Sequence, residues 1–198
     1  MNSDWKDQWK FHIGGHGSIV DLHENLRAEI MRRWKRCLPF NEELFDRWER
    51  ARFLKFGEGS NIYDTSLVIG DVKVGENTWV GPFTILDGSG GLTIGGFCSI
   101  SSGVQIYTHD SVKWALSGGK EDYEYDAVEI GNYCYVGPLT VITKGLTIGH
   151  HCLIGANSLV NSDIPEYSIA FGSPCRIIGE VKVKDDETID LVYYSEDQ

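Results

Sequence analysis

The sequence predicts a mainly β protein: a solenoid of short strands, preceded by a helical region and interrupted by one extruded loop. Three observations support this class. The first part of the chain has helical spacing, aliphatic residues then recur every six positions, and glycine is concentrated in that repeating part. Of 23 glycines in 198 residues, three precede Gly57, twenty lie between Gly57 and Gly179, and none follows. This distribution indicates repeated tight turns rather than a collagen-like or disordered chain.

The N-terminal third is predicted to be helical. In residues 21–37 an apolar residue recurs every four positions, which is the spacing of one helix face. Asp21 and Glu24 resemble a capping box at the start of this helix. A second helix is expected to begin at Asn41, a good N-cap residue, and to run to about Lys55.

From Val68 to Val160 the apolar period is six residues, which fits neither a helix nor a simple alternating strand. A residue with a small or medium-sized side chain stands four positions after most of these aliphatics, and both sets are expected to point inward. A fixed short period is the signature of a β-solenoid, and three hexapeptides would close a coil of 18 residues. Glycine after a strand is expected to permit a corner with positive φ. The expected stacked pairs are Ile130 with Ile148, Val136 with Ile154 and Ile142 with Val160.

These residues resemble the hexapeptide-repeat acyltransferases, over about residues 66–179. The segments 143–160 (TKGLTIGHHCLIGANSLV) and 164–179 (IPEYSIAFGSPCRIIG) are similar to that family's last coils and terminating segment. The resemblance implies a left-handed parallel β-helix, acetyl-CoA as the acyl donor and a homotrimer with a donor groove between adjacent subunits.

The expected organisation has three parts. Residues 1–56 form a helical N-terminal region, residues 57–179 a hexapeptide domain with an extruded loop at 107–128, and residues 180–198 an acidic C-terminal tail. In the loop the aliphatic period is lost: its expected positions hold Val112, Gly118 and Glu124. Since functional residues often lie on loops of a rigid scaffold, this interruption is the predicted site.

The interruption begins with Thr108, His109 and Asp110. In sugar O-acetyltransferases of the family, a histidine at the start of such a loop is the general base, so the resemblance implies this role for His109. Acyl transfer to an alcohol needs a base, because a neutral hydroxyl is a poor nucleophile. Asp110 is a candidate to orient the ring or to bind the acceptor. Trp114, Tyr123 and Tyr125 could stack on a sugar or pack the loop onto a neighbouring subunit.

Donor-binding residues follow from the resemblance by position. Gly137 and Gly155 are 18 residues apart, hence on one face of successive coils, and Ala156 follows. Each is a candidate main-chain contact, and each could supply an oxyanion donor. Pro174 lies in a GSPCR segment that matches the family's terminal pattern. Lys144 and Arg176, the latter closing that segment, are candidate partners for the CoA phosphates.

Charge and cysteine content exclude other classes. The net charge of -11 argues against nucleic acid or an anionic membrane as the main partner. Five cysteines without a CxxC pair fit reduced thiols better than a disulfide framework or a zinc knuckle. The sequence has neither a signal-peptide apolar region nor an apolar run of about 18 residues, so a cytoplasmic protein without a membrane span or metal is expected.

The leading hypothesis is a CoA-dependent acetyltransferase acting on a sugar hydroxyl in surface polysaccharide biosynthesis. The first alternative is an N-acetyltransferase of a nucleotide-linked amino sugar. A metalloenzyme of the γ-carbonic anhydrase type shares the solenoid but needs three histidines, and outside the loop the repeat offers only the adjacent His150 and His151. The last alternative is a non-catalytic scaffold that binds no acetyl-CoA.

Overall fold

The structure, a computed structural model, describes residues 18–194. The chain divides into two compact units, residues 1–46 and 47–198, which are described separately. The expected helical region, residues 1–56, extends into both units, and its first 17 residues lie outside the described residues.

The N-terminal unit contains α2 (Ile19–Trp34) and α3 (Phe40–Leu44). The capping box of α2 is formed by Ser18 and Asp21, not by Asp21 and Glu24 as expected. The Ser18 hydroxyl accepts the Asp21 N–H at 3.2 Å, and the Asp21 carboxylate accepts the Ser18 N–H at 2.8 Å. The helix therefore begins earlier than predicted, because a serine three residues before an acidic residue makes the same reciprocal cap.

The single helix expected from Asn41 to Lys55 is broken in two. The chain leaves α3 at Phe45, whose backbone is extended at φ -107° and ψ 144°. It resumes as α4 (Arg47–Phe53), which belongs to the second unit.

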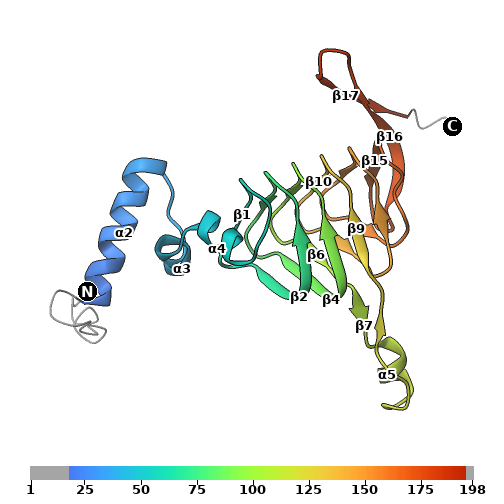
Figure 1. The fold of residues 1–198 in the computed structure, drawn as a ribbon, viewed down its shortest axis with the longest axis horizontal. Coiled ribbons are helices and arrows are strands. Elements are labelled where there is room, and N and C mark those ends of the chain that lie inside the picture. Colours follow the sequence, from blue (N-terminus) through green and yellow to red (C-terminus); the bar gives the residue numbers. More distant parts are fainter. Residues whose placement is uncertain (1–17, 195–198) are drawn as a thin grey trace, which may run out of the picture. The chain divides into compact units, whose positions relative to one another are not determined.

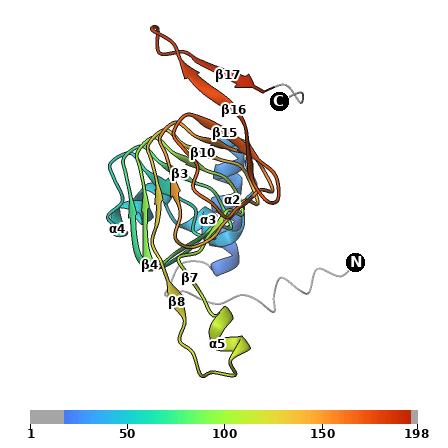
Figure 2. The same ribbon diagram turned by 90° about the vertical axis from the view of Figure 1, so that its right-hand side faces the viewer.

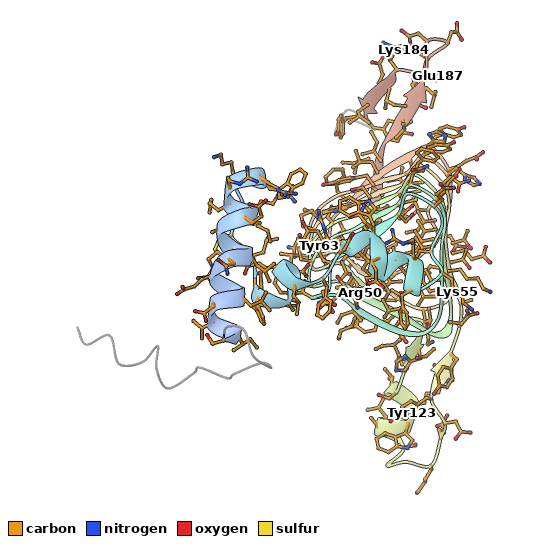
Figure 3. The ribbon with its side chains drawn as sticks, turned by 60° about the vertical axis from the view of Figure 1, so that its left-hand side comes forward. Arg50, Lys55, Tyr63, Tyr123, Lys184 and Glu187 are labelled. Atoms are coloured by element: carbon orange, nitrogen blue, oxygen red, sulfur yellow. The ribbon has the colours of Figure 1, made fainter. Side chains whose placement is uncertain are left out.

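Helix α4 packs on the first strand and caps the first coil. Arg50 donates hydrogen bonds to the carbonyl oxygens of Tyr63 and Ser66, the latter at 2.7 Å. Figure 3 shows Arg50 and Tyr63 at this end of the stack. The guanidinium of Arg47 lies 4.3 Å from the centroid of the Tyr63 ring. These contacts give partners to main-chain groups at the open end of the stack.

The second unit is a parallel β-helix, which confirms the predicted fold class (Figure 1). Its coils pair edge to edge, and Figure 2 views the stack nearly end-on, so that they overlap. The first sheet contains, in spatial order, β1 (Asn61–Ile62), β3 (Trp79–Val80), β5 (Ser99–Ile100), β10 (Tyr135–Val136), β13 (Leu153–Ile154), β15 (Ser168–Phe171), β16 (Arg176–Val183) and β17 (Ile189–Tyr193). The second contains β12 (Thr147–Ile148), β9 (Val128–Ile130), β4 (Ile85–Ile94), β6 (Gln105–Ile106), β11 (Val141–Ile142) and β14 (Leu159–Val160), with β2 (Leu67–Val74) paired to β4.

The strand register matches the predicted 18-residue coil. Ile130 pairs with Ile148, Val136 with Ile154, and Ile142 with Val160. A shift of one residue would turn every inward side chain outward, so this register fixes the core.

Both predicted sets of inward positions form that core. The repeated aliphatics from Val74 to Val160 are buried, most of them fully. The residues four positions later are buried as well: Thr78, Thr84, Cys98, Val104, Cys134, Thr140, Leu146, Cys152 and Ser158.

Each coil turns at three corners. The first corner follows the first sheet, the second corner follows the next strand, and the third corner closes the coil. The first-corner segments are 81–84, 101–104, 137–140 and 155–158. The second-corner segments are 107–127 and 143–146, and in the two preceding coils this corner lies within the long strands β2 and β4, at 69–71 and 87–91. The third-corner segments are 75–78, 95–98, 131–134 and 149–152.

The glycine that follows many strands is required by close packing and not by a positive φ, which corrects the prediction. A Cβ at Gly137 would lie 2.5 Å from the amide nitrogen of Ala156 in the next coil. The positive φ occurs two residues later and falls on non-glycine residues, for example 62° at Tyr133 and 61° at Leu139.

The expected acidic tail is largely an ordered hairpin. β16 begins before the predicted boundary at Gly179 and pairs antiparallel with β17. Lys182 pairs with Glu180 and Lys184 with Asp190, each at 2.8 Å. Figure 3 labels Lys184 near the tip of this hairpin. Residues 195–198 lie outside the described residues.

Candidate active site

The interruption at 107–128 folds as a hairpin at the second corner. β7 (His109–Asp110) pairs antiparallel with β8 (Glu124–Tyr125), and the short helix α5 (Val112–Leu116) lies between them. Figures 1 and 2 show this hairpin projecting from the stacked coils.

His109 lies at the foot of the hairpin against a carboxylate of the preceding coil. Its Nδ1 is 2.6 Å from Oδ2 of Asp87. An ionised carboxylate only accepts hydrogen bonds, so Nδ1 carries the hydrogen and Nε2 of the neutral ring keeps a free lone pair. The His109 side chain is 33% exposed while that of Asp87 is 1% exposed. The ring can therefore meet a ligand on one side while its other side is fixed.

The buried carboxylate of Asp87 is fully supplied with donors. Oδ1 accepts the N–H and hydroxyl of Ser89, and Oδ2 accepts the N–H of Thr108 at 3.1 Å as well as His109 Nδ1. Burial raises the pKa of Asp87, but the hydrogen bonds from Ser89, Thr108 and His109 outweigh it and hold this pKa below its usual value. Asp87 is thus ionised beside the imidazole at neutral pH.

Two aromatic rings of the hairpin stack on His109, and a third packs against one of them. The ring of Tyr125 stacks on it at a centroid distance of 5.7 Å, and Tyr123 lies nearly parallel at 6.4 Å. Trp114 packs edge-on against Tyr123 at 5.6 Å. The side chains of Tyr123 and Trp114 remain 40% and 45% exposed. Exposed aromatic faces of this kind suit the apolar face of a sugar ring.

Asp110 does not orient the imidazole. Its carboxylate accepts the N–H of Val112 at 2.9 Å and pairs with Lys144 at 3.2 Å. Successive side chains of a strand point to opposite sides, so Asp110 turns away from the ring of the residue before it. The backbone hydrogen bond from Val112, followed by the bond from Lys144, lowers the pKa of Asp110.

Lys144 belongs to this second corner and not to the predicted donor positions. Besides Asp110, its Nζ pairs with Glu124 at 3.4 Å. Lys113 pairs with the other oxygen of Glu124 at 2.6 Å. The hydrogen bond to Asp110, ahead of that to Glu124, raises the pKa of Lys144. The hairpin base is therefore a network of two carboxylates and two ammonium groups.

The predicted donor residues gather at the first corner. The amides of Gly137 and Gly155 donate to Ile154 and Ala170 in the next turn of chain, at 2.8 and 2.9 Å. These two N–H groups are therefore not available as oxyanion donors, which corrects the expectation for them. Ala156 is exposed, and in the described part of the chain its N–H has no acceptor. Of the three predicted contacts, only this amide is open to a ligand.

The terminal GSPCR segment lies against the same corner. The N–H of Gly172 donates to the Ser158 hydroxyl at 3.1 Å, and the N–H of Cys175 donates to the Leu159 carbonyl at 2.8 Å. Pro174 and Arg176 are both exposed there. The Arg176 guanidinium donates to the Cys175 carbonyl at 2.7 Å.

Comparison with known proteins agrees with this architecture. Residues 127–162 match the family model described as bacterial transferase hexapeptide (six repeats). Over these residues the chain is similar to that family. The galactoside O-acetyltransferase of Escherichia coli is 34% identical to it over 134 residues, which are 57% of this chain and 65% of that relative. The match thus spans slightly less than two thirds of the relative's own length.

Solved structures with the same fold include two acyltransferases. A hexapeptide-repeat-containing acetyltransferase of Vibrio cholerae is 25% identical, with a TM-score of 0.57, over 80% of this chain and 92% of that one. AntD, an N-acyltransferase from Bacillus cereus in complex with dTDP and 3-hydroxybutyryl-CoA, is 23% identical, with a TM-score of 0.57, over 62% of this chain and 70% of that one. At this identity the second likeness concerns the fold alone.

Sequence reasoning missed Asp87 as the partner of His109 in the hexapeptide domain. The two residues are 22 positions apart, in adjacent coils. The signal was present, because Asp87 follows the inward Leu86, next to the glycine-rich insertion 88–91. A carboxylate directly after an inward aliphatic residue is costly to bury without donors.

Other features of the hexapeptide domain lie away from this site. Among the described residues, no group of three or more His, Cys, Asp and Glu side chains is placed to hold a metal ion. The Nδ1 of His150 accepts the Asn132 N–H at 2.9 Å, and the ring of His151 stacks between those of Tyr133 and Tyr167. Within residues 18–194, no helix is both long and apolar enough to cross a bilayer.

One groove of the second unit contains none of the predicted site residues. It lies between hairpin β16–β17 and the third-corner side chains, and Tyr133, Tyr135 and Leu191 are among its lining residues. The candidate site is therefore defined by its side-chain chemistry and not by the depth of a cavity.

Proposed function

We propose that this protein is an acetyl-CoA-dependent acetyltransferase that transfers the acetyl group to a sugar hydroxyl. The observation that carries the proposal is the Asp87–His109 pair, with Nδ1 bound at 2.6 Å and the other ring nitrogen available as a base. The 34% identity to a galactoside O-acetyltransferase supports both the reaction type and the sugar class.

In this mechanism His109 Nε2 takes the proton of the acceptor hydroxyl as its oxygen attacks the thioester carbonyl. Collapse of the tetrahedral intermediate breaks the carbon–sulfur bond, and the thiolate of CoA takes the proton from the imidazolium. Asp87 holds the tautomer and stabilises the imidazolium while it exists. The rings of Tyr123 and Trp114 hold the sugar over the imidazole.

The donor half of the site is proposed at the first corner. Pro174, Arg176 and the open amide of Ala156 lie there, with the buried Gly137 and Gly155 shaping the surface. His109 lies at the second corner of the coil that precedes the one with Gly137, so the two halves occupy different edges of one β-helix. A homotrimer, in which the first corner of one subunit meets the second corner of its neighbour, would complete the site.

The first experiment measures acetyl transfer with purified full-length protein. Acetyl-CoA is offered with galactosides, other glycosides, nucleotide-linked amino sugars and oligosaccharides of surface polysaccharides, and free CoA thiol is followed. Mass spectrometry and hydroxylamine sensitivity of the product distinguish an ester from an amide. An amide formed on an amino sugar, with no ester on any glycoside, would replace the O-acetyl assignment by the N-acetyl alternative.

The base assignment is tested by His109→Asn. We expect kcat to fall about 10²- to 10⁴-fold, the usual contribution of a general base, while calorimetric binding of acetyl-CoA is kept. His151→Asn is the matched control and is expected to keep its activity. Undiminished activity in His109→Asn would contradict the assignment of His109 as the general base. A monomer by light scattering would contradict a site shared between subunits.

A further inference from the structure

The hairpin that carries His109 is held from both neighbouring coils. In the second sheet, Leu86 pairs with Ile106 on one side, and Ile142 pairs with Ile106 on the other. Asp87, the residue after Leu86 in β4, binds the imidazole. Two residues after the following strand comes Lys144, and it reaches the same hairpin from the opposite side.

Lys144 forms an ion pair with a carboxylate on each strand of the hairpin. Its Nζ lies 3.2 Å from Oδ2 of Asp110 and 3.4 Å from Oε2 of Glu124. Asp110 and Glu124 are paired across the two-stranded ladder, next to the pair of His109 with Tyr125. One ammonium group thus bridges both strands immediately beside the candidate base.

Without the ammonium group of Lys144, the repulsion between the carboxylates of Asp110 and Glu124 would be offset less. Like charges directly opposite on paired strands are destabilising. Lys113 also contacts Glu124, but it belongs to the hairpin's own short helix and cannot fix the hairpin to the body. Lys144 is part of the coil, so its two ion pairs connect the hairpin to the stack of coils.

We propose that Lys144 is a positioning residue for His109, acting through Asp110 and Glu124, and that it does not bind the CoA phosphates. This inference rests on the proposed function of His109. The ion pairs set the angle at which β7 leaves the coil, and therefore where Nε2 points. A displacement of about 1 Å at a reacting group can cost a large factor in rate.

Five variants isolate this role. Lys144→Met removes the charge at similar length, and Lys144→Arg restores it. Lys120→Met is the matched control, because Lys120 lies in the same hairpin and, among the described residues, its ammonium makes no ion pair. Asp110→Asn with Glu124→Gln removes both partners, alone and combined with Lys144→Met.

Steady-state kinetics with acetyl-CoA and the best glycoside acceptor from the proposed screen give the first readout. Lys144→Met is expected to lower kcat at least fivefold with an unchanged KM for acetyl-CoA, and Lys144→Arg to recover most of the loss. In the Asp110→Asn, Glu124→Gln background, Lys144→Met is expected to change kcat less than twofold. An increased KM for acetyl-CoA with unchanged kcat would overturn the proposal and return Lys144 to the donor site.

Hydrogen exchange gives a readout that does not depend on activity. The Asp126 amide donates to the Thr108 carbonyl at 2.9 Å, across the foot of the hairpin. Its exchange, and that of peptides within 107–128, is expected to accelerate in Lys144→Met and not in Lys120→Met. Unchanged exchange would overturn the proposal. If the wild type transfers no acetyl group while exchange responds as expected, the proposed function fails and the positioning contact stands.

Discussion

The second and third corners of the β-helix arise from the same repeat, yet they use polar side chains in opposite ways. At the third corner, residues at equivalent positions make the same bond in each coil. The side chains of Thr78, Cys98, Cys134 and Cys152 each donate to a carbonyl of the next turn of chain, at 2.9 to 3.1 Å. At the second corner each coil contributes a different polar residue: Asp87, His109 and Lys144.

This difference separates groups that maintain the fold from groups suited to chemistry. A bond repeated in every coil satisfies a buried carbonyl and leaves no polar atom for a ligand. At the second corner the bonds run between different residue types, and among the described residues they leave Nε2 of the partly exposed His109 without a hydrogen bond. In a solenoid, therefore, an unrepeated buried charge is a better indicator of a site than a repeated thiol.

The largest effect expected from this comparison is on activity, in Asp87→Asn. The amide would present an N–H₂ group or a neutral oxygen to His109 Nδ1, so the tautomer with a free Nε2 is no longer enforced. We expect kcat to fall at least 10²-fold, as when the carboxylate of a catalytic triad is replaced. Stopped assays of thiol release measure the loss, and circular dichroism checks that the fold is kept. Near wild-type kcat would show that the buried carboxylate serves only the fold.

The stacked coils and the hairpin also differ in what their glycines do. A Cβ at Gly155 would lie 1.9 Å from the ring of Phe171, whereas a Cβ at Gly118 in the hairpin meets nothing within 4 Å. Gly155→Ala is expected to destabilise the protein by about 3 kcal/mol or more, in the range of overpacked cores. Gly118→Ala, at φ 67°, should cost only about 1 kcal/mol from the left-handed backbone. Denaturant unfolding of both variants measures the difference, and equal losses would contradict the packing role of the coil glycine.

These glycines show how far sequence reasoning reached. The period of six predicted the coil length, the stacked pairs and the inward residues, because burial repeats with the chain. It assigned the wrong reason to the glycines, since contact with the next coil cannot be seen within one hexapeptide. It located His109 through the break in the period. It missed Asp87 because the pairing of adjacent coils brings this residue to the ring across 22 positions.

The helical region was predicted less accurately for a related reason. A local pattern fixed the presence of α2, but Ser18 and Asp21 form its cap in place of the expected pair. The break at Phe45, between α3 and α4, has no strong local signal such as proline or glycine. Helix ends of this kind depend on packing that the pattern alone does not contain.

The charge on Asp87 should make stability depend on pH. Because its pKa in the folded state is lowered, its contribution is fully present above the unfolded value, near 3.9, and is lost as the pH falls through the folded value. We expect the free energy of unfolding to fall more steeply below about pH 4 in the wild type than in Asp87→Asn. Urea unfolding between pH 2.5 and 6 tests this expectation. Parallel curves for the two proteins would contradict a lowered folded-state pKa at this corner.

The smallest effect is expected at the repeated bond of the third corner. Cys134 is buried and its thiol lies 3.1 Å from the Gly149 carbonyl, so Cys134→Val would fill the space but leave that acceptor without a donor. We expect a loss of about 1 kcal/mol, because thiols are weak donors and a carbonyl retains a second lone pair.

Cys134→Ser, which keeps a donor, should lose less stability than Cys134→Val if the hydrogen bond matters more than the apolar volume. Thermal unfolding of the two variants compares the two terms, and acetyl transfer should be unaffected in both, since this corner holds none of the proposed catalytic groups. A valine variant as stable as the wild type would show that the thiol ladder is packing alone, and the contrast between the two corners would then rest on the second corner by itself.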